Sequence, residues 1–302
     1  MALVSVLVCT SSRQGHIAET VRCVLDCDYP EFEVVVVDQG CSRVTGEVLS
    51  SIGDPRVRYL QTKSIGLPAA RNLGTASCRG ALVAVTDDDC LPKADWLTEL
   101  VRPFADLKVG AVFGNVLAGS HDSTSGFVPS YVRHERLVVR SVLRKHLIEG
   151  MGACFAFRRS VWSEFGGFDP LLGKGALMRS AGETDFCIRI LLNGGYIVQA
   201  PEAEVVHNGF RDWSEGEKLV EGYLWGVGAL YVKWLKTGHL SVFFHVLAVA
   251  YRFLFGGQAV HLGGRNRFGP KLRAFFAGAR AGLVHPVDAR HHFVETSTSH
   301  SS

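Results

Sequence analysis

The sequence repeatedly places a short run of apolar, largely β-branched residues directly before an acid. Residues 32–38 read FEVVVVD and residues 81–89 read ALVAVTDDD, and each run is long enough for one strand. Segments with helical spacing of apolar residues lie between such runs, for example at 16–27 and 67–77. Buried strands that alternate with helices are typical of a parallel sheet covered on both faces. We therefore expect an α/β fold that opens in a Rossmann-like way.

Three consecutive carboxylates, Asp87, Asp88 and Asp89, end the second of these runs. Like charges this close repel one another unless a cation lies among them. In parallel sheets, ligands bind at the carboxyl ends of the strands, where Thr10 and Asp38 are also expected. No G-x-G-x-x-G follows the first strand and no G-x-x-x-x-G-K-[ST] occurs, so the sequence offers neither common phosphate-binding glycine loop. The pattern favours a divalent cation as the phosphate clamp.

Composition indicates a folded, cytoplasmic protein. The 302 residues are 47% hydrophobic, enough to fill a sizeable core. Eight cysteines are scattered without a C-x-x-C pair, which favours buried thiols in a reducing compartment over disulfides or a zinc site. The apolar start of the chain is shorter than a membrane span, and the apolar stretch 240–257 is interrupted by His245 and Arg252. We therefore expect no membrane crossing.

Positive charge is concentrated near the C-terminus. The net charge is +3, but residues 233–292 carry nine Lys or Arg and one acid, so this segment is +8 and the remainder is −5. Basic residues mixed with apolar and aromatic ones suit an anionic membrane surface, with the protein peripheral at the inner face of the membrane. A merely solvated basic face and a homodimer interface are the alternatives. No nucleic-acid-binding motif accompanies the charge, so we expect no nucleic-acid partner.

Seven motifs resemble, in order and spacing, the family 2 inverting glycosyltransferases of the GT-A fold. They are VSVLVCTSSR, FEVVVVDQG, GLPAARNLG, VAVTDDDCLPKADWL, FRRSVWSEFGGFDP, GETDFCIRILLNGGY and PEAEVVHNG, and they cover roughly residues 3–210. The expected organisation is a GT-A catalytic domain (1–212) with a nucleotide-binding half (1–118) and an acceptor-binding half (119–212), a helical basic and apolar region (213–290) and a disordered tail (291–302).

The resemblance implies transfer of a sugar, with inversion, from a nucleotide-sugar to an acceptor hydroxyl, and Mg²⁺ or Mn²⁺ as cofactor. The metal would stabilise the charge that develops on the leaving nucleoside diphosphate. We expect a UDP- or dTDP-sugar in preference to a GDP-sugar, and a glycan or lipid-linked acceptor in surface polysaccharide or glycolipid assembly. Two other functions stay open: a sugar-phosphate nucleotidyltransferase on a similar sheet, and a non-catalytic membrane-surface binding module.

The resemblance also assigns roles to individual donor-site positions. Asp87 and Asp89 match the DxD pair, with Asp87 toward the ribose and Asp89 on the metal, while Asp88 falls at the variable centre and is either a helper or exposed. Asp38 matches the acid that hydrogen-bonds the nucleotide base. The residues implied in nucleotide-sugar binding are Thr10, Arg13, Asp38, Arg71, Asp87 and Asp88.

The resemblance further implies a catalytic base near a helix N-terminus and a histidine on the metal. Alignment on Arg189 places Glu183 at the catalytic acid, where aspartate is common, and leaves Asp185 as the second choice. The structural alternative is that both acids only favour the positive end of the helix dipole. His207 in VVHNG matches a position where relatives place a metal-binding histidine, and a purely structural histidine is the alternative.

Overall fold

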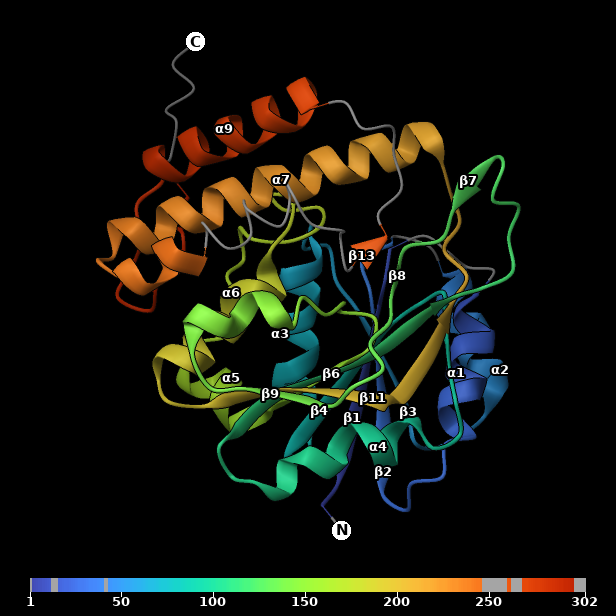
Figure 1. Cartoon of the computed structure of the whole chain (residues 1–302). Coiled ribbons are helices and arrows are strands. Elements are labelled where there is room, and N and C mark those ends of the chain that lie inside the picture. Colours follow the sequence, from blue (N-terminus) through green and yellow to red (C-terminus); the bar gives the residue numbers. More distant parts are fainter. Residues whose placement is uncertain (1, 12–15, 41–42, 246–259, 262–267, 296–302) are drawn as a thin grey trace.

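The computed structural model describes residues 2–11, 16–40, 43–245, 260–261 and 268–295 (Figure 1). A mixed sheet forms its centre, and helices lie on both faces of that sheet (Figure 1). The strands are β1 (Val4–Thr10), β2 (Phe32–Asp38), β3 (Val57–Gln61), β4 (Leu82–Asp87), β5 (Cys90–Pro92), β6 (Val109–Ala118), β7 (Gly126–Phe127), β8 (Ser130–Tyr131), β9 (Leu137–Val139), β10 (Phe155–Arg158), β11 (Tyr196–His207), β12 (Arg211–Asp212) and β13 (Val260–His261).

The central strands are parallel, as the alternation of strands and helices predicts. β1 pairs with β2 and β4, and β2 pairs with β3, all in parallel. β10 separates β4 from β6 and is antiparallel to both. The strand order is β13-β8-β6-β10-β4-β1-β2-β3; β11 pairs with β5, β6 and β9, and β7 with β12 forms a separate ribbon. The expected α/β fold with a mainly parallel central sheet is therefore confirmed.

Alternate side chains of the central strands enter two different hydrophobic cores. Leu7 and Val35 belong to the core on one face of the sheet, and Val6 and Val34 belong to the core on the other. Successive side chains of a strand point to opposite faces. The run Val34–Val37 in FEVVVVD is continuously apolar because both faces of the strand are covered.

Helices supply those covers. They are α1 (Ile17–Leu25), α2 (Val44–Ile52), α3 (Leu67–Ser77), α4 (Trp96–Val101), α5 (Arg159–Glu164), α6 (Gly182–Leu192), α7 (Trp213–Lys236) and α9 (Phe268–Val284), with 3₁₀ helices η1 (Arg102–Ala105) and η2 (Val142–Leu147). α7 and α9 lie side by side as an outer layer, α9 being the outermost element of the fold on that side (Figure 1).

Glycines allow α7 and α9 to touch backbone to backbone. A Cβ added to Gly278 would lie 1.9 Å from the carbonyl oxygen of Trp225, and one added to Gly228 would lie 2.1 Å from that of Phe275. A side chain at either position would have to displace backbone atoms, which close-packed interiors resist. The two helices are therefore matched to each other at specific positions.

Residues 291–295 differ from the expected disordered tail. His292 and Phe293 are buried, and the backbone N–H of Phe293 donates to Asp169 Oδ2 at 2.8 Å. Val287 also forms a β-bridge with Phe293. The physical reason is that one aromatic side chain and one backbone donor anchor this stretch, whereas its composition suggests only a polar end. Residues 296–302 lie outside the described part of the chain.

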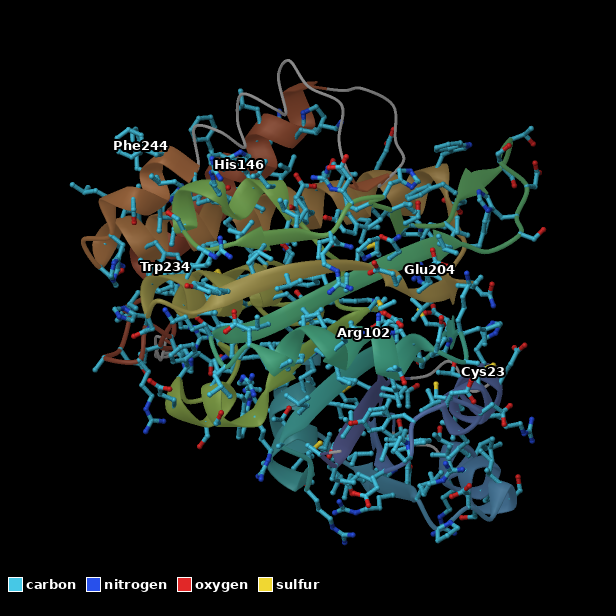
Figure 2. The ribbon with its side chains drawn as sticks, turned by 60° about the horizontal axis from the view of Figure 1, so that its bottom comes forward. Cys23, Arg102, His146, Glu204, Trp234 and Phe244 are labelled. Carbon is cyan, nitrogen blue, oxygen red and sulfur yellow. The ribbon has the colours of Figure 1, made fainter. Side chains whose placement is uncertain are left out.

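A lysine of α7 is buried between two aspartates from other segments. Lys233 Nζ lies 2.8 Å from Asp169 Oδ2 and 2.7 Å from Asp185 Oδ1, and all three side chains are 0% exposed. Arg189 gives Asp185 a second cation at 3.0 Å. The neighbouring indole of Trp234, labelled in Figure 2, is buried and donates to Asp185 Oδ1 at 3.1 Å. Because burying charge is costly unless it is paired, α7 is integral to the core that contains α6.

Two expectations drawn from composition can be compared with the structure. The described cysteines all have free thiols and are buried or partly buried, as the spacing predicts. Among the described helices, none is long and apolar enough to span a membrane. Most of the apolar stretch 240–257 lies outside the described residues, so the expectation that it does not cross a membrane stays a prediction.

Replacing Lys233 with methionine should strongly destabilise the protein, because Asp169 and Asp185 then stay buried with one cation fewer. Removing one partner of a buried ion pair costs about 3–5 kcal/mol. Lys218→Met, at an exposed position of the same helix, should change the free energy of unfolding by less than about 0.5 kcal/mol. Urea unfolding at pH 7 compares the two variants, and equal stabilities would contradict the importance of the pair.

The effect of Lys233→Met should also depend on pH. Burial would raise the pKa of Asp185, but Lys233 and Arg189 hold it below its ordinary value of 3.8. A carboxyl group with a lowered folded pKa stabilises the protein above its unfolded pKa, and that contribution is lost as the pH falls through the folded pKa. The difference in unfolding free energy between wild type and variant should therefore be full at neutral pH and shrink below about pH 3.8.

Candidate active site

The ends of neighbouring parallel strands bring the predicted donor-site residues together. Thr10, the last residue of β1, is opposite Asp38, the last residue of β2. Asp87 ends β4, which pairs with the other side of β1. Asp88 and Asp89 follow at once and lead into β5. All five residues therefore lie at one edge of the sheet, as the sequence predicts.

The three aspartates differ in their surroundings. Asp87 is partly exposed, whereas Asp88 and Asp89 are buried. Asp88 Oδ2 accepts a hydrogen bond from Thr10 Oγ1 at 2.5 Å, and the Asp88 carbonyl accepts one from Thr20 at 3.0 Å. Asp88 was predicted to be either a helper or exposed, and the structure shows that it is not exposed. Its carboxylate instead ties the turn after β4 to the end of β1.

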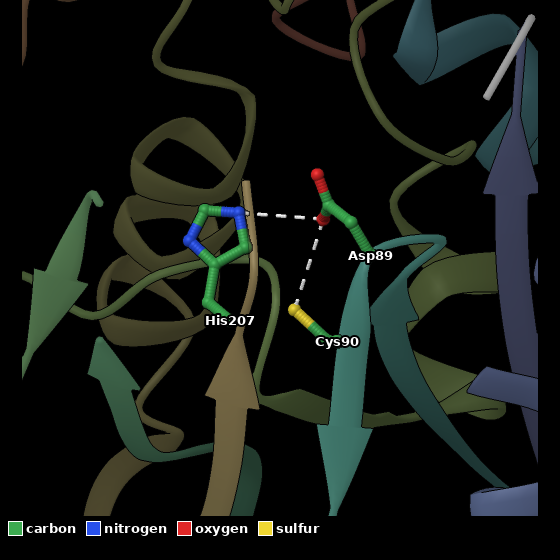
Figure 3. Close-up of side chains that lie close together, drawn as sticks. All are labelled: Asp89, Cys90 and His207. Atoms are coloured by element: carbon green, nitrogen blue, oxygen red, sulfur yellow. Dashed lines mark hydrogen bonds and ion pairs between the residues drawn. The ribbon is translucent and has the colours of Figure 1, made fainter. Parts of the chain in front are cut away.

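Asp89 faces His207 at the point where β11 ends (Figure 3). The two side chains meet because His207 is opposite Cys90, the first residue of β5, in the β11–β5 pair. His207 Nε2 lies 3.3 Å from Asp89 Oδ1, and both side chains are buried. Within the described residues, Asp89, Cys90 and His207 form a cluster of ligand types close enough to share one metal ion.

The donor atoms of this cluster fit a hard divalent cation. His207 Nδ1 lies 2.8 Å from the carbonyl oxygen of Pro129. An N–H at Nδ1 donates to that carbonyl, which leaves the Nε2 lone pair for a metal. A Cβ on Gly209 would lie 2.4 Å from His207 Nε2 and 2.7 Å from Asp89 Oδ2, so glycine keeps room beside both atoms. Burial raises the pKa of the Cys90 thiol well above 9.0, so the site offers oxygen and nitrogen rather than thiolate.

Asp38, predicted to bind the nucleotide base, is fixed in place by two hydrogen bonds. Asp38 is buried and doubly held: Oδ1 accepts the N–H of Gly40 at 2.7 Å, and Oδ2 accepts the hydroxyl of Tyr59 at 2.9 Å. Burial and the adjacent carboxylate raise the pKa of Tyr59 to about 12, so its phenol stays a donor. Each carboxylate oxygen can accept a second hydrogen bond, which leaves Asp38 a fixed acceptor. Arg13 lies outside the described residues.

A buried arginine connects this edge to helix α6. Arg71 of α3 is 3% exposed, and its Nη1 lies 2.5 Å from Glu183 Oε1. Glu183 is in the first turn of α6, where the helix dipole favours an acid. Burial would raise the pKa of Glu183, but Arg71 and, less strongly, Lys145 lower it, so the carboxylate is ionised at neutral pH. Its side chain remains 25% exposed and can reach a bound molecule.

Sequence reasoning missed two residues that shape this pair. A Cβ on Gly152 would lie 2.2 Å from Glu183 Oε1 and 2.3 Å from Arg71 Nη2. Lys145 is 2% exposed, its Nζ donates to the carbonyl of Ile148 at 2.6 Å, and burial lowers its pKa. Neither residue carries a local signal, because a glycine between Met and Ala and a lysine in a basic stretch are both ordinary on a surface.

Asp185, the second choice for the base, has a wholly different environment. Its side chain is 0% exposed and contacts Lys233, Arg189 and Trp234. Residues two positions apart on a helix are rotated by about 200°. Glu183 and Asp185 therefore point to opposite sides of α6, and an acceptor could reach Asp185 only if the core opened.

Curated proteins similar to this chain are glycosyltransferases. A glucosyl-dolichyl phosphate glucuronosyltransferase from Haloferax volcanii is 29% identical over 232 residues, which cover 74% of each chain. Glycosyltransferase GlyG from Streptococcus pneumoniae is 24% identical over 163 residues, which cover 53% of this chain and 54% of GlyG.

Solved structures share the fold at low sequence identity. A mannosyltransferase from Pyrobaculum calidifontis, in complex with GDP-Man and Mn²⁺, has 19% identity and a TM-score of 0.62 over 94% of this chain and 87% of its own. TarS 1–349 from S. aureus, in complex with UDP-GlcNAc, has 19% identity and a TM-score of 0.54 over 76% of this chain and 66% of its own. These neighbours are GT-A glycosyltransferases, so the expected GT-A fold is confirmed.

The sequence profile of Glycosyl transferase family 2 matches residues 5–166. The match includes the strand ends with Asp38 and the three aspartates, while Glu183 and His207 lie beyond it. Because it spans more than half of the 302 residues, the protein belongs to glycosyl transferase family 2.

Proposed function

We propose that this protein is a metal-dependent, inverting glycosyltransferase that moves a sugar from a nucleoside-diphosphate sugar to an acceptor hydroxyl. The Asp89–His207 pair, with the room that Gly209 leaves beside it, carries the proposal. Family membership supports glycosyl transfer over the nucleotidyltransferase and over the non-catalytic binding module. Neighbours solved with GDP-Man or UDP-GlcNAc support a nucleotide-sugar donor.

Asp89 and His207 would hold Mg²⁺ or Mn²⁺, and neighbours solved with Mn²⁺ support a divalent metal. When bound, such a cation supplies positive charge that stabilises the leaving nucleoside diphosphate. Asp87, the partly exposed member of the triple, would accept hydrogen bonds from the ribose. Asp88 would act indirectly, because its carboxylate is already engaged with Thr10.

The remaining donor contacts concern the base and the diphosphate. Thr10 and Asp38 would lie beside the nucleotide base, with Asp38 accepting an N–H from it. Arg71, and Arg13 from outside the described residues, would bring positive charge to the phosphates. A UDP- or dTDP-sugar stays our prediction for the donor. Because neighbours were solved with both UDP and GDP compounds, the nucleotide base has to be measured directly.

Glu183 is the proposed general base. Its ionised carboxylate would accept the proton of the acceptor hydroxyl as the acceptor oxygen bonds to the anomeric carbon. The bond from that carbon to the diphosphate oxygen breaks on the opposite face, which inverts the configuration. Arg71 would hold Glu183 in place through their ion pair. Asp185 is proposed as a structural residue because it is fully buried between cations.

A lipid-linked acceptor is the class we favour. The relative from Haloferax volcanii is named for a dolichyl phosphate compound, and this chain presents a surface suited to an anionic bilayer. That surface is the outer face of α9, in which Leu272, Phe276 and Leu283 lie beside Arg273 and Arg280 within a sector of roughly 100°.

Charge and exposure support membrane contact by this outer face. Phe276 is 61% exposed and Leu283 is 62% exposed, and the whole of α9 contains no acidic residue. Phe244, after the end of α7, also projects from the edge of the molecule (Figure 2) and is 60% exposed. Apolar side chains flanked by arginines suit the interface of an anionic membrane. The location would then be peripheral, at the inner face of the membrane.

Calorimetric titration with UDP, dTDP and GDP, each with and without Mn²⁺, tests the proposed function. One nucleotide should bind wild type at least about tenfold more tightly with Mn²⁺ than without, because a metal held by Asp89 and His207 would supply positive charge to the diphosphate. Gly209→Ala should keep the metal-free affinity and lose the Mn²⁺ effect. Gly269→Ala, whose Cβ would meet nothing within 4 Å, is the matched control. Absence of Mn²⁺-dependent binding to every nucleotide would refute the proposal.

Glu183→Gln should leave nucleotide binding unchanged and slow catalysis by about 10²–10⁴-fold, because the amide cannot accept the proton. Release of nucleoside diphosphate from UDP-GlcNAc, UDP-glucuronic acid and GDP-mannose, with water as acceptor, measures the rate. Glu164→Gln, at an exposed position of α5, should behave as wild type. A fully active Glu183→Gln would remove Glu183 from the role of base.

Flotation with vesicles tests the outer face of α9. Wild type should bind phosphatidylcholine vesicles that contain phosphatidylglycerol, and should bind pure phosphatidylcholine much less. Each basic residue near an anionic surface contributes about 1 kcal/mol, so the double variant Arg273→Glu, Arg280→Glu should bind more than about tenfold more weakly. Leu107→Ser, at an 85% exposed position outside α9, should not change binding. Wild type that floats with neither vesicle would exclude the membrane role.

A further inference from the structure

The backbone just before Glu183 is strained. Arg179 and Ala181 have φ angles of 66° and 74°, which residues with a side chain rarely adopt. Ala181 is also the N-cap of α6, and its side chain makes no capping hydrogen bond. Such conformations persist only where the surroundings impose them. Backbone hydrogen bonds hold part of this segment, from the N–H of Met178 to Leu171 and from the N–H of Arg179 to Ala176, and side-chain contacts with α7 add to them.

Two side-chain contacts join the strained segment to α7. Ser180 Oγ donates to the carbonyl oxygen of Tyr223 at 2.9 Å. The guanidinium of Arg179 lies 4.0 Å from the ring centre of Trp225, close enough for a cation–π interaction. Arg179 and its neighbour Ser180 are therefore held by two positions, Trp225 and Tyr223, on one turn of α7.

The same turn of α7 lies close against residues 178–180 at Gly226. A Cβ on Gly226 would lie 2.1 Å from Ser180 Oγ, 2.7 Å from the carbonyl oxygen of Met178 and 2.8 Å from the carbonyl carbon of Ser180. Two of these atoms belong to backbone, so a methyl group there must move either the helix or the segment. By contrast, a Cβ on Gly222, one turn earlier, would meet only Arg179 Cβ at 4.0 Å.

A second contact with α7 lies on the other side of Glu183. Lys233 Nζ and the indole N–H of Trp234 both bind Asp185, two residues after Glu183. The first turn of α6 is therefore fixed from both directions by one helix: before Glu183 through residues 178–181, and after it through Asp185.

From these contacts we infer that α7 positions the base, and that Gly226 is a positioning residue because its missing side chain lets α7 lie against residues 178–181. The inference rests on the proposed role of Glu183. A misplacement of about 1 Å can lower a rate by about 10²-fold without any change in the reacting groups. The helix outside the family match would then set the geometry of the reaction.

A matched glycine pair on α7 tests this inference in the full-length protein. The assay is Mn²⁺-dependent release of nucleoside diphosphate from whichever of UDP-GlcNAc, UDP-glucuronic acid and GDP-mannose wild type hydrolyses fastest. Gly226→Ala should lower kcat at least about tenfold and leave the donor KM within about twofold, because Glu183 moves while the strand ends do not. Gly222→Ala should match wild type in both constants.

Trp225→Leu is the second variant, for use if Gly226→Ala does not fold. It removes the contact with Arg179 and should also lower kcat at unchanged donor KM. A folded Gly226→Ala with the kcat of Gly222→Ala would overturn the inference, as would an equal loss of kcat and donor affinity. Glu183→Gln, assayed in parallel, separates the positioning role from the proposed function. If Glu183→Gln is fully active, Glu183 is not the base, and the positioning role fails with it. If wild type hydrolyses no donor, the proposed function fails. If Glu183→Gln is inactive while Gly226→Ala is fully active, only the positioning role fails.

Discussion

The ammonium group of Lys233, buried between two aspartates, is the interaction on which the arrangement of the second half of the chain depends. Asp169 comes from the turn after α5, Asp185 from α6 and Lys233 from α7, and Asp169 also accepts the backbone N–H of Phe293. Each charge is unfavourable in the core until its partners arrive. The four segments can therefore be buried only together, which makes the C-terminal helices part of the catalytic fold.

This constraint gives two neighbouring acids opposite uses. Asp185 is neutralised on the inner side of α6 by Lys233 and Arg189. Glu183, on the other side, has Arg71 as its near partner and keeps part of its side chain exposed. Both carboxyl groups have lowered pKa values, yet only one can meet a substrate. A lowered pKa therefore does not by itself identify a general base, and our proposal of Glu183 rests on its exposed side chain.

The central sheet could be predicted from sequence because its signals are local. A β-branched run such as FEVVVVD specifies a strand buried on both faces, and parallel pairing then brings Asp38 and Asp87 to one edge without further information. His207 was predicted beside Asp89 only through the resemblance of VVHNG to the family motif, because a single histidine after a strand does not indicate its partner. The role of Gly209 could not be predicted, because it appears only when the distances from this glycine to His207 and Asp89 are known.

The features that the sequence could not predict share one property. Each depends on a contact with a residue that is distant in the sequence. Gly222 and Gly226 are both glycines of one helix, and nothing near them in sequence distinguishes Gly222, where a Cβ would meet only Arg179 Cβ at 4.0 Å, from Gly226, where it would meet Met178 and Ser180. The prediction of a disordered tail was wrong for residues 291–295 for the same reason, because Phe293 is anchored by Asp169, 124 residues earlier. Helical period says which residues share a face, but the partner of that face is chosen by the fold as a whole. Residues that act through geometry rather than chemistry therefore stay invisible until the helices are packed.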